Sequence, residues 1–285
     1  MYYAIENELL SAEINSMGAE LHSLKSKKSG FEYLWQGNPD IWYGQSPVLF
    51  PIIGRLLDDK YRYEGREYTL QKHGFARKKE FTLVSCEGAK AVFSLKDSPE
   101  TLEMYPFEFE LRITFELDGG SLKVSHQVFN NSGKDMYFSL GAHPGFNCEI
   151  GDYLEFEENE TLRTEKIDTD AYRIPETFPV LDNSKKIVIT KDIFNDDALI
   201  LPGVKSKKVT LKSDKHKRQV EFTLGSPTYL GIWAKPGAPY VCIEPWFGVN
   251  DNREKKDSIS QKEGIVKLGA GDCFTQKWEA KPIDE

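Results

Sequence analysis

The chain has 285 residues, of which 39% are hydrophobic and 12% aromatic, enough apolar material for a substantial folded core. Its 45 acidic residues outnumber its 37 basic ones, and the formal charge of −8 argues against binding to nucleic acid or to anionic membrane surfaces. No segment approaches the ~20 apolar residues of a membrane-spanning helix, and the acidic N-terminal stretch lacks the apolar centre of a signal peptide.

The first informative elements lie between residues 44 and 107. The stretch 44–59, GQSPVLFPIIGRLLDD, carries Arg55 after a long apolar run and a glycine. The stretch 72–78, KHGFARK, carries His73 and Arg77 around a glycine-containing turn. Residues 91–97, AVFSLKD, are typical of a strand, and residues 97–107, DSPETLEMYPF, predict one short helix.

The clearest hairpin follows at residues 107–128. Apolar positions from Phe107 to Leu117 alternate with polar ones without interruption, and the same period resumes from Leu122 after the turn Asp118-Gly119-Gly120. This pattern predicts two antiparallel strands with one face on a core. His126 falls on the apolar side of its strand, so we interpret it as a core histidine.

Further strands are predicted at residues 186–192, 208–213, 218–226, 240–246 and 273–281, separated by polar or glycine-containing turns. Regularly spaced strands without intervening helices indicate the all-β class, as a large antiparallel β-sandwich with few short helices. The sequence contains no internal repeat and no linker rich in glycine, serine or proline. We therefore expect a single domain over residues 1–285.

The absence of several motifs narrows the chemistry. No GxGxxG, GxxxxGK[ST], HExxH or GxSxG motif is present, so nucleotide-dependent, zincin and α/β-hydrolase reactions have no support. The four cysteines are far apart and form no CxxC pair, which favours free thiols in a reducing compartment over a disulfide frame or a zinc site. We expect a cytoplasmic protein that catalyses a reaction without a metal or a cofactor, or that simply binds a ligand.

Two later stretches hold the strongest candidate residues. In SLGAHPGFN, residues 139–147, His143 lies between small residues and a proline, which leave room for another group beside the imidazole. In VCIEPWFGVND, residues 241–251, Glu244 follows three apolar residues, and burying a carboxylate there is costly unless it is paired or used. The neighbouring Trp246 offers a flat apolar face for a ring such as a sugar.

Each candidate also has a purely structural interpretation. Arg55 is then a surface charge after a buried strand, Arg77 belongs to a solvated basic run, and His73 is an exposed turn residue. Glu244 is then an edge-strand side chain that points outward, and His143 fills a packing position. Because perturbed ionisable groups gather at functional sites, we favour the functional interpretation for Glu244, His143 and Arg55.

The order of GR, HGFAR, YPF, GAHPGFN, NDDALIL and CIEPWFG along the chain resembles the aldose 1-epimerase (galactose mutarotase) family, specifically its LacX-type bacterial branch. The resemblance extends over nearly the whole chain, and HPGFN together with EPWFG is its most specific part. It implies a β-supersandwich whose concave face binds a monosaccharide. It also implies interconversion of the α and β anomers without a metal or a cofactor.

Carried over residue by residue, the resemblance makes Glu244 the general base and His143 the general acid, with His73 assisting as a second histidine. It makes Arg55 a ligand of sugar hydroxyls and places the sugar-binding aspartate in FNDDALIL. We take Asp197 for that role because it directly precedes the apolar ALIL strand.

Two alternatives to a mutarotase of a free hexose stay open. HGFAR is also similar to the phosphosugar branch of the superfamily, in which case the substrate is a hexose 6-phosphate and Arg77 meets the phosphate. The other alternative is a non-catalytic carbohydrate-binding protein with the same fold. We expect a monomer or a homodimer, with a monosaccharide as the ligand.

Overall fold

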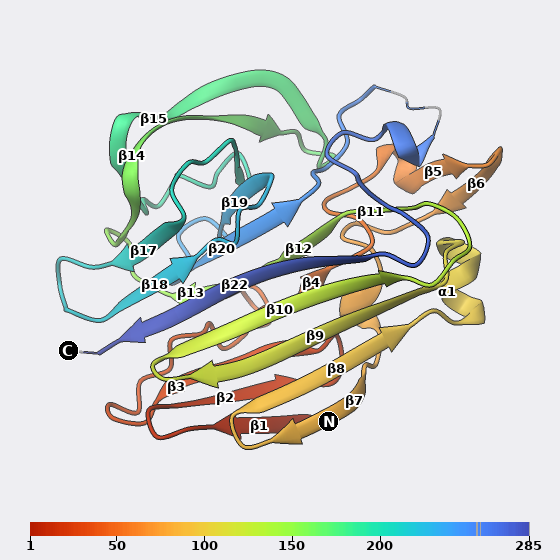
Figure 1. Ribbon diagram of the computed structural model, residues 1–285. Coiled ribbons are helices and arrows are strands. Elements are labelled where there is room, and N and C mark those ends of the chain that lie inside the picture. The colour runs from red at the N-terminus through yellow and green to blue at the C-terminus, as the bar shows by residue number, and fades with distance from the viewer. Residues whose placement is uncertain (255, 257, 285) are drawn as a thin grey trace.

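The computed structural model describes residues 1–254, 256 and 258–284, and in them strands dominate over helices (Figure 1). Helical turns are confined to α1 (Pro99–Met104) and the 3-10 segments η1 (Leu57–Asp59), η2 (Ala76–Lys78) and η3 (Ile259–Gln261) in the described ranges. The short helix predicted within residues 97–107 is thus confirmed. It begins because Ser98 and Thr101 form a capping box and Pro99 occupies its first turn.

One large antiparallel sheet forms most of the described chain. Its strands follow in the order β4 (Val48–Leu49), β12 (Leu140–Ala142), β20 (Tyr240–Phe247), β19 (Tyr229–Trp233), β16 (Leu199–Pro202), β14 (Tyr153–Ile167), β17 (Lys208–Lys212), β18 (Gln219–Thr223), β22 (Cys273–Ile283), β10 (Ser121–Asn130), β9 (Phe109–Asp118), β8 (Lys90–Lys96) and β7 (Thr82–Glu87). In addition, β13 (Gly145–Asn147) pairs with β20, and β15 (Arg173–Val188) pairs with β14. The predicted all-β antiparallel architecture is confirmed.

Smaller sheets complete the structure. The strands β1 (Tyr2–Glu6), β2 (Leu10–Asn15) and β3 (Glu20–Ser26) form a separate sheet, and β1 lies against β7, β8 and β9. Two further pairs are β5 (Lys60–Tyr63) with β6 (Arg66–Thr69), and β11 (Met136–Phe138) with β21 (Val266–Leu268). No helix in the described ranges is long and apolar enough to span a bilayer.

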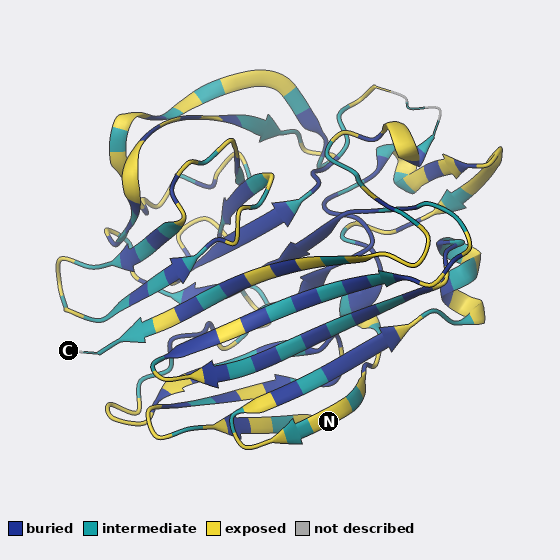
Figure 2. Cartoon of the chain, viewed as in Figure 1, coloured by how far each residue is buried: buried dark blue, intermediate teal, exposed yellow. Residues whose placement is uncertain are grey.

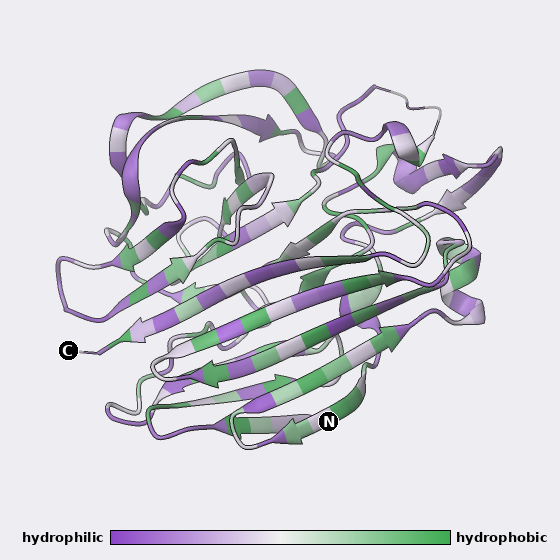
Figure 3. Ribbon diagram, in the orientation of Figure 1, coloured by the Kyte–Doolittle hydropathy of each residue, from purple (hydrophilic) through white to green (hydrophobic). Residues whose placement is uncertain are grey.

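The core lies between the sheets and is set by period-two patterning. Along β9 and β10, buried residues alternate with more exposed ones, as Figure 2 shows, and the same strands alternate in hydropathy in Figure 3. The two strands pair from Ser121 with Asp118 to Asn130 with Phe109, which confirms the predicted hairpin. Each fully buried side chain of the size of Phe109 contributes about 1.5–3 kcal/mol relative to exposure.

Candidate active site

The candidate site begins at an interruption between two short strands. β12 ends at Ala142 and β13 starts at Gly145, and both pair with the same strand, β20. The two residues between them, His143 and Pro144, leave the ladder opposite Ile243 and Glu244, with the Ile243 N–H donating to the Pro144 carbonyl at 3.2 Å. Because proline has no N–H and fixes its own φ, the interruption holds the imidazole beside the centre of β20.

Glu244 lies in the middle of this central strand and is 1% exposed, so it does not point outward from an edge strand. Its Oε2 lies 3.3 Å from Nε2 of His143, which is 8% exposed. The indole N–H of Trp246, two residues further along β20, donates to the same Oε2 at 3.1 Å. Among the described residues Oε1 has no hydrogen-bond partner, so this second oxygen is available to a ligand.

Aromatic rings fix the orientation of the His143 imidazole. Trp42 stacks on it with ring centroids 5.1 Å apart and an interplanar angle of 28°. Trp233 meets it edge-on at 5.6 Å. Cations are stabilised over indole faces, so this stack favours the protonated imidazole.

The glycines that flank His143 make room for these tryptophans. A Cβ on Gly141 would lie 2.8 Å from Trp246, and a Cβ on Gly145 would lie 3.1 Å from Trp42. The sequence-based expectation that the small residues leave space for a ligand is therefore incomplete. They admit the indole rings that orient the carboxylate and the imidazole.

His73 approaches the same place from a strained turn. Its φ is +67° and that of Gly74 is +69°, and a Cβ on Gly74 would lie 2.2 Å from the Phe50 carbonyl oxygen. The Gly54 N–H donates to Nδ1 of His73 at 3.1 Å, so the neutral ring carries its proton on Nε2. The rings of His73 and His143 are 6.1 Å apart, edge to face.

Burial shifts the acid–base properties of all three residues. It raises the pKa of Glu244 well above its usual value, an effect that Asp197 reinforces while the Trp246 N–H and Lys72 oppose it. Burial lowers the pKa of His143 to about 3 and that of His73 well below its usual value. Burial therefore opposes both charged forms of the pair, the Glu244 carboxylate and the His143 imidazolium.

These residues lie at a cavity of about 810 Å³, large enough for a sugar ring. Its lining brings together His73, Arg77, His143, Asp197, Glu244 and Trp246, all of which the sequence singled out. It also includes residues that sequence reasoning missed, namely Trp42, Lys72, Phe194, Trp233, Lys235 and Asn250. The sequence pattern offers no signal that would single out Trp42 and Trp233 as cavity residues.

The charged residues of the lining differ in how they are paired. Asp168 pairs with Arg253, and Asp196 pairs with Lys166. In the described part of the chain Lys72, Arg77 and Lys235, which also line the cavity, make no ion pair, and Nε of Arg77 is buried without a hydrogen-bond partner.

Asp197 has a φ of +70°, and its Oδ1 accepts a hydrogen bond from the Ala198 N–H at 2.8 Å. Because Asp196 is held by Lys166, Asp197 is the acid of this turn that is left for a ligand.

Arg55 lies apart from the cavity-lining set. Its Nε and Nη2 each donate to the Asp59 carboxylate at 2.9 Å, and its guanidinium lies 5.5 Å from the centre of the Tyr172 ring. Arg253 lies over the same ring at 4.9 Å and binds Asp168 and Asp170. Arg55 therefore supports the turn at residues 168–172, which carries Asp168 and Ala171 into the cavity wall.

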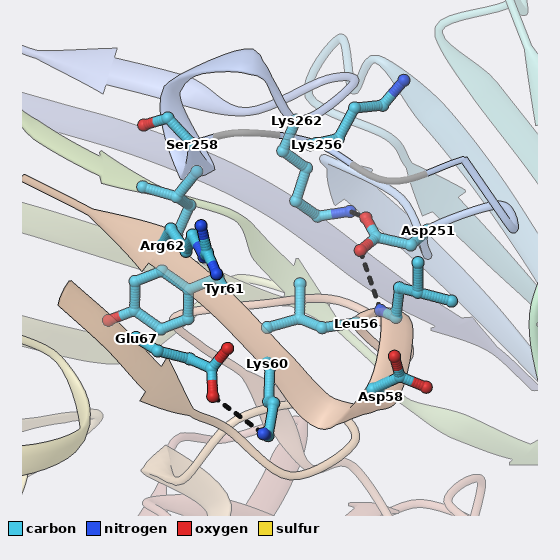
Figure 4. Close-up of a pocket in the computed structure, with 12 residues that line it drawn as sticks. Leu56, Asp58, Lys60, Tyr61, Arg62, Glu67, Asp251, Lys256, Ser258 and Lys262 are labelled. Carbon is cyan, nitrogen blue, oxygen red and sulfur yellow. Dashed lines mark hydrogen bonds and ion pairs between the residues drawn. The ribbon is translucent and has the colours of Figure 1, made fainter. Parts of the chain in front are cut away.

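A second pocket of about 380 Å³ lies between η1, β5 and the segment that leads into η3 (Figure 4). Its charged groups are largely paired with one another. Lys262 donates to Asp251 at 2.6 Å, and Lys60 pairs with Glu67 at 2.7 Å. Among the described residues that line this pocket no carboxyl faces an imidazole, so we assign the site to the larger cavity.

The antiparallel sandwich with an acid–base pair on the cavity floor has the galactose mutarotase-like fold. The sequence profile described as aldose 1-epimerase matches residues 1–263. The chain therefore belongs to the aldose 1-epimerase family, as the resemblance of its motifs predicted.

Individual relatives agree with this assignment. The chromosomal LacX protein of Lactococcus lactis subsp. lactis is 34% identical over 94% of this chain and 95% of its own length. A galactose mutarotase related enzyme from Lactobacillus acidophilus superposes with a TM-score of 0.95 at 34% identity, over 100% of this chain and 98% of its own. A galactose mutarotase-like protein from Lactobacillus casei ATCC 334 gives a TM-score of 0.94 at 30% identity, over 99% and 100%.

Proposed function

We propose that this protein is an aldose 1-epimerase that interconverts the α and β anomers of a free hexose, with Glu244 as general base and His143 as general acid. The observation that supports this most is the 3.3 Å contact between His143 Nε2 and Glu244 Oε2 in the cavity. In a cyclic hemiacetal the anomeric hydroxyl oxygen, which loses a proton, and the ring oxygen, which gains one, are both bonded to C1. An acid and a base that serve both must therefore lie close together, as these two do.

The reaction proceeds by opening and reclosing the sugar ring. Glu244 takes the proton of the anomeric hydroxyl, whose oxygen becomes a carbonyl as the bond between C1 and the ring oxygen breaks. The ring oxygen keeps that electron pair and receives a proton from the His143 imidazolium. The open chain rotates about C1–C2, and the reverse steps close the ring on the other face. Positioned acid and base groups contribute about 10² to 10⁴ in rate.

The surroundings of the pair fit these roles. Ring opening starts from the Glu244 carboxylate and the His143 imidazolium. This state contains the same number of protons as the neutral pair of carboxylic acid and imidazole. It is reached when one proton moves from Glu244 to His143 across their 3.3 Å contact. The Trp246 N–H and Lys72 stabilise the carboxylate, and the Trp42 face stabilises the imidazolium. His73 offers Nε2–H to the sugar as a donor.

Other lining residues supply contacts for hydroxyl groups. Asp197 and the Asn250 side chain are acceptors, and Oδ1 of Asn250 is buried without a partner. The edges and faces of Trp42 and Trp233 provide apolar surface for the ring. Buried polar atoms without partners are costly, so a ligand that satisfies them binds more tightly.

The test is polarimetry of freshly dissolved α-glucose and α-galactose. We expect Glu244→Gln and His143→Asn to lower the rate of anomerisation by about 10² to 10⁴. His126→Asn and Glu160→Gln are matched controls, because both residues are buried and lie outside the cavity lining. Parent-like rates in both site variants would overturn the assigned roles, and sugar binding without any acceleration by the parent protein would favour a carbohydrate-binding protein.

A second candidate substrate is a hexose 6-phosphate. The observation in its favour is the group of lining cations, Lys72, Arg77 and Lys235, which have no ion pair among the described residues while two of the lining acids are neutralised. Arginine and lysine side chains in this state suit a phosphate dianion. Running the same assay with glucose 6-phosphate decides between the two substrates by their kcat/KM values.

A further inference from the structure

A buried thiol adjoins the proposed acid–base pair. Cys242 lies two residues before Glu244 on β20, and successive even-numbered positions of a strand project to the same face. The register partner of Cys242 is Gly145. A Cβ added to this glycine would lie 3.4 Å from the sulfur, so the thiol lies directly beside the chain segment that carries His143. The interruption at His143 brings the imidazole to the same face from the neighbouring strand.

As a result three different metal-ligating groups converge. One ligand atom each from His143, Cys242 and Glu244 lies within 4.8 Å of the others, and all three residues are buried. Nitrogen, sulfur and carboxylate oxygen are the donor set of Zn²⁺, whose ligands sit about 2.0–2.3 Å from the ion. The contact of 3.3 Å between His143 and Glu244 already suits two ligands of one tetrahedral ion, so that Cys242 needs only a small side-chain movement.

We propose that His143, Cys242 and Glu244 form a binding site for Zn²⁺ or a similar thiophilic divalent cation, and that its occupancy inhibits the enzyme. The ion reaches the site through the cavity, because His143 and Glu244 line it. Three protein ligands leave a fourth position toward the cavity for water. The bound ion engages the two groups that the proposed reaction needs, so a loaded site cannot exchange protons with a sugar.

Charge balance supports the dication. Binding releases the proton of the Cys242 thiol and the proton that Glu244 or His143 holds. The resulting thiolate and carboxylate neutralise the two positive charges of the ion, so the loaded site adds no net charge to a buried position. Lys72 and Arg77 act electrostatically on the same histidine and oppose the ion. We therefore expect reversible binding that is weaker than in a structural zinc site. A buried cysteine alone would be an ordinary small core residue; the convergence with the other two ligands distinguishes this one.

The test uses Co²⁺ as a spectroscopic probe and Zn²⁺ as the inhibitor, on the full-length protein. We expect one Co²⁺ per chain with a thiolate-to-cobalt charge-transfer band, displaced by Zn²⁺. Cys242→Ser should remove the band and weaken Zn²⁺ binding on the order of 10- to 100-fold. Cys148→Ser, which alters another buried thiol, is the matched control and should behave as the parent. If Cys242→Ser does not fold, Cys242→Ala replaces it.

The inhibition arm rests on the proposed function, whereas the binding arm does not. Where the protein accelerates anomerisation, Zn²⁺ should abolish the acceleration, a chelator should restore it, and Cys242→Ser should resist inhibition. A Co²⁺ complex without the thiolate band, or Zn²⁺ binding that Cys242→Ser leaves unchanged, would overturn the site. Absence of anomerase activity together with the thiolate band would overturn the proposed function and leave the metal site intact.

Discussion

Two strands of the large sheet carry the same side-chain pattern with different results. On β20, Glu244 contacts His143 of the neighbouring chain segment and accepts the N–H of Trp246. On β22, Gln276 and Trp278 have the same spacing, and Gln276 is the register partner of His126 on β10. A hydrogen bond of 2.8 Å from Gln276 Nε2 to the carbonyl of Pro245 links the two places.

The difference lies in the neighbouring strand. β10 pairs with β22 without interruption from Leu122 to Phe129, and there Nδ1 of His126, Oε1 of Gln276 and Nε1 of Trp278 are buried without partners. Beside β20 the partner strand is broken, glycines admit indole rings, and a cavity reaches the polar groups. Both places hold a buried histidine opposite a polar side chain. Only the place beside β20, where the strand pairing is interrupted, forms a candidate site, and the place where β10 pairs continuously with β22 does not.

The largest effect that this comparison predicts concerns the two tryptophans, which are equally buried at 3% exposure. Trp246→Phe removes the donor to Glu244, and a hydrogen bond to a charged group is worth about 1.5–3 kcal/mol. We expect kcat to fall on the order of 10- to 100-fold. Trp278→Phe removes an N–H that has no partner and should leave kcat unchanged. Equal effects on kcat in the polarimetric assay would contradict the distinction.

The next effect concerns the glycine that accommodates Trp246. A Cβ on Gly231, the register partner of Glu244, would lie 2.7 Å from the indole ring. Gly231→Ala should therefore destabilise the protein by about 1–3 kcal/mol and displace the indole N–H from Glu244. Gly133→Ala is the control, because nothing lies within 4 Å of a Cβ there. Chemical denaturation measures both, and a stable, fully active Gly231→Ala protein would show that the ring has room to move.

The smallest effect concerns pH and His126. Burial lowers the pKa of this histidine to about 4, so the unfolded chain takes up its proton near pH 6.5 while the folded protein does not. Folding is thus progressively disfavoured as pH falls from about 6.5 toward 4. Between pH 7 and pH 5.5 this residue should cost about 1 kcal/mol.

His126→Gln, which does not titrate, should lose less stability than the parent over the same interval. The measurement is the free energy of unfolding at both pH values for both proteins. Parallel losses would mean that His126 is protonated in the folded state.

Much of the fold was predictable because a strand with one buried face alternates apolar and polar residues in the sequence. Residues 107–117 alternate without interruption and residues 122–128 do so except at His126, and the structure has β9 and β10 there. The long hairpin of β14 and β15 was not predicted, since stretches such as EENETLRTEK carry charges on both faces and show no period-two pattern. The stretch predicted as a strand at 186–192 belongs to its end, and β15 stops at Val188.

The candidate site was predictable where a residue contradicted its surroundings. Glu244 after three apolar residues and His143 between glycines are such contradictions, and the structure brings them into contact. The sequence did not reveal Trp42 or Trp233, because nothing local distinguishes an indole at a cavity from one in a core. Arg55, whose position after a glycine resembles that of the sugar-binding arginine, is bound to Asp59 and does not line the cavity, so its contact with sugar hydroxyls stays a prediction.

The turn over residues 168–172 forms part of the cavity wall, but the arginines that hold it in place do not line the cavity. Arg253 with Asp168 and Asp170, and Arg55 with Asp59 and Tyr172, are partly or fully exposed contacts. Dissolved salt weakens such contacts, with a screening length of about 8 Å at physiological ionic strength. For the proposed sugar substrate, even an uncharged one, we therefore expect KM to rise with added salt while kcat stays constant. A KM that does not change with salt would mean that the cavity wall keeps its shape without these exposed contacts.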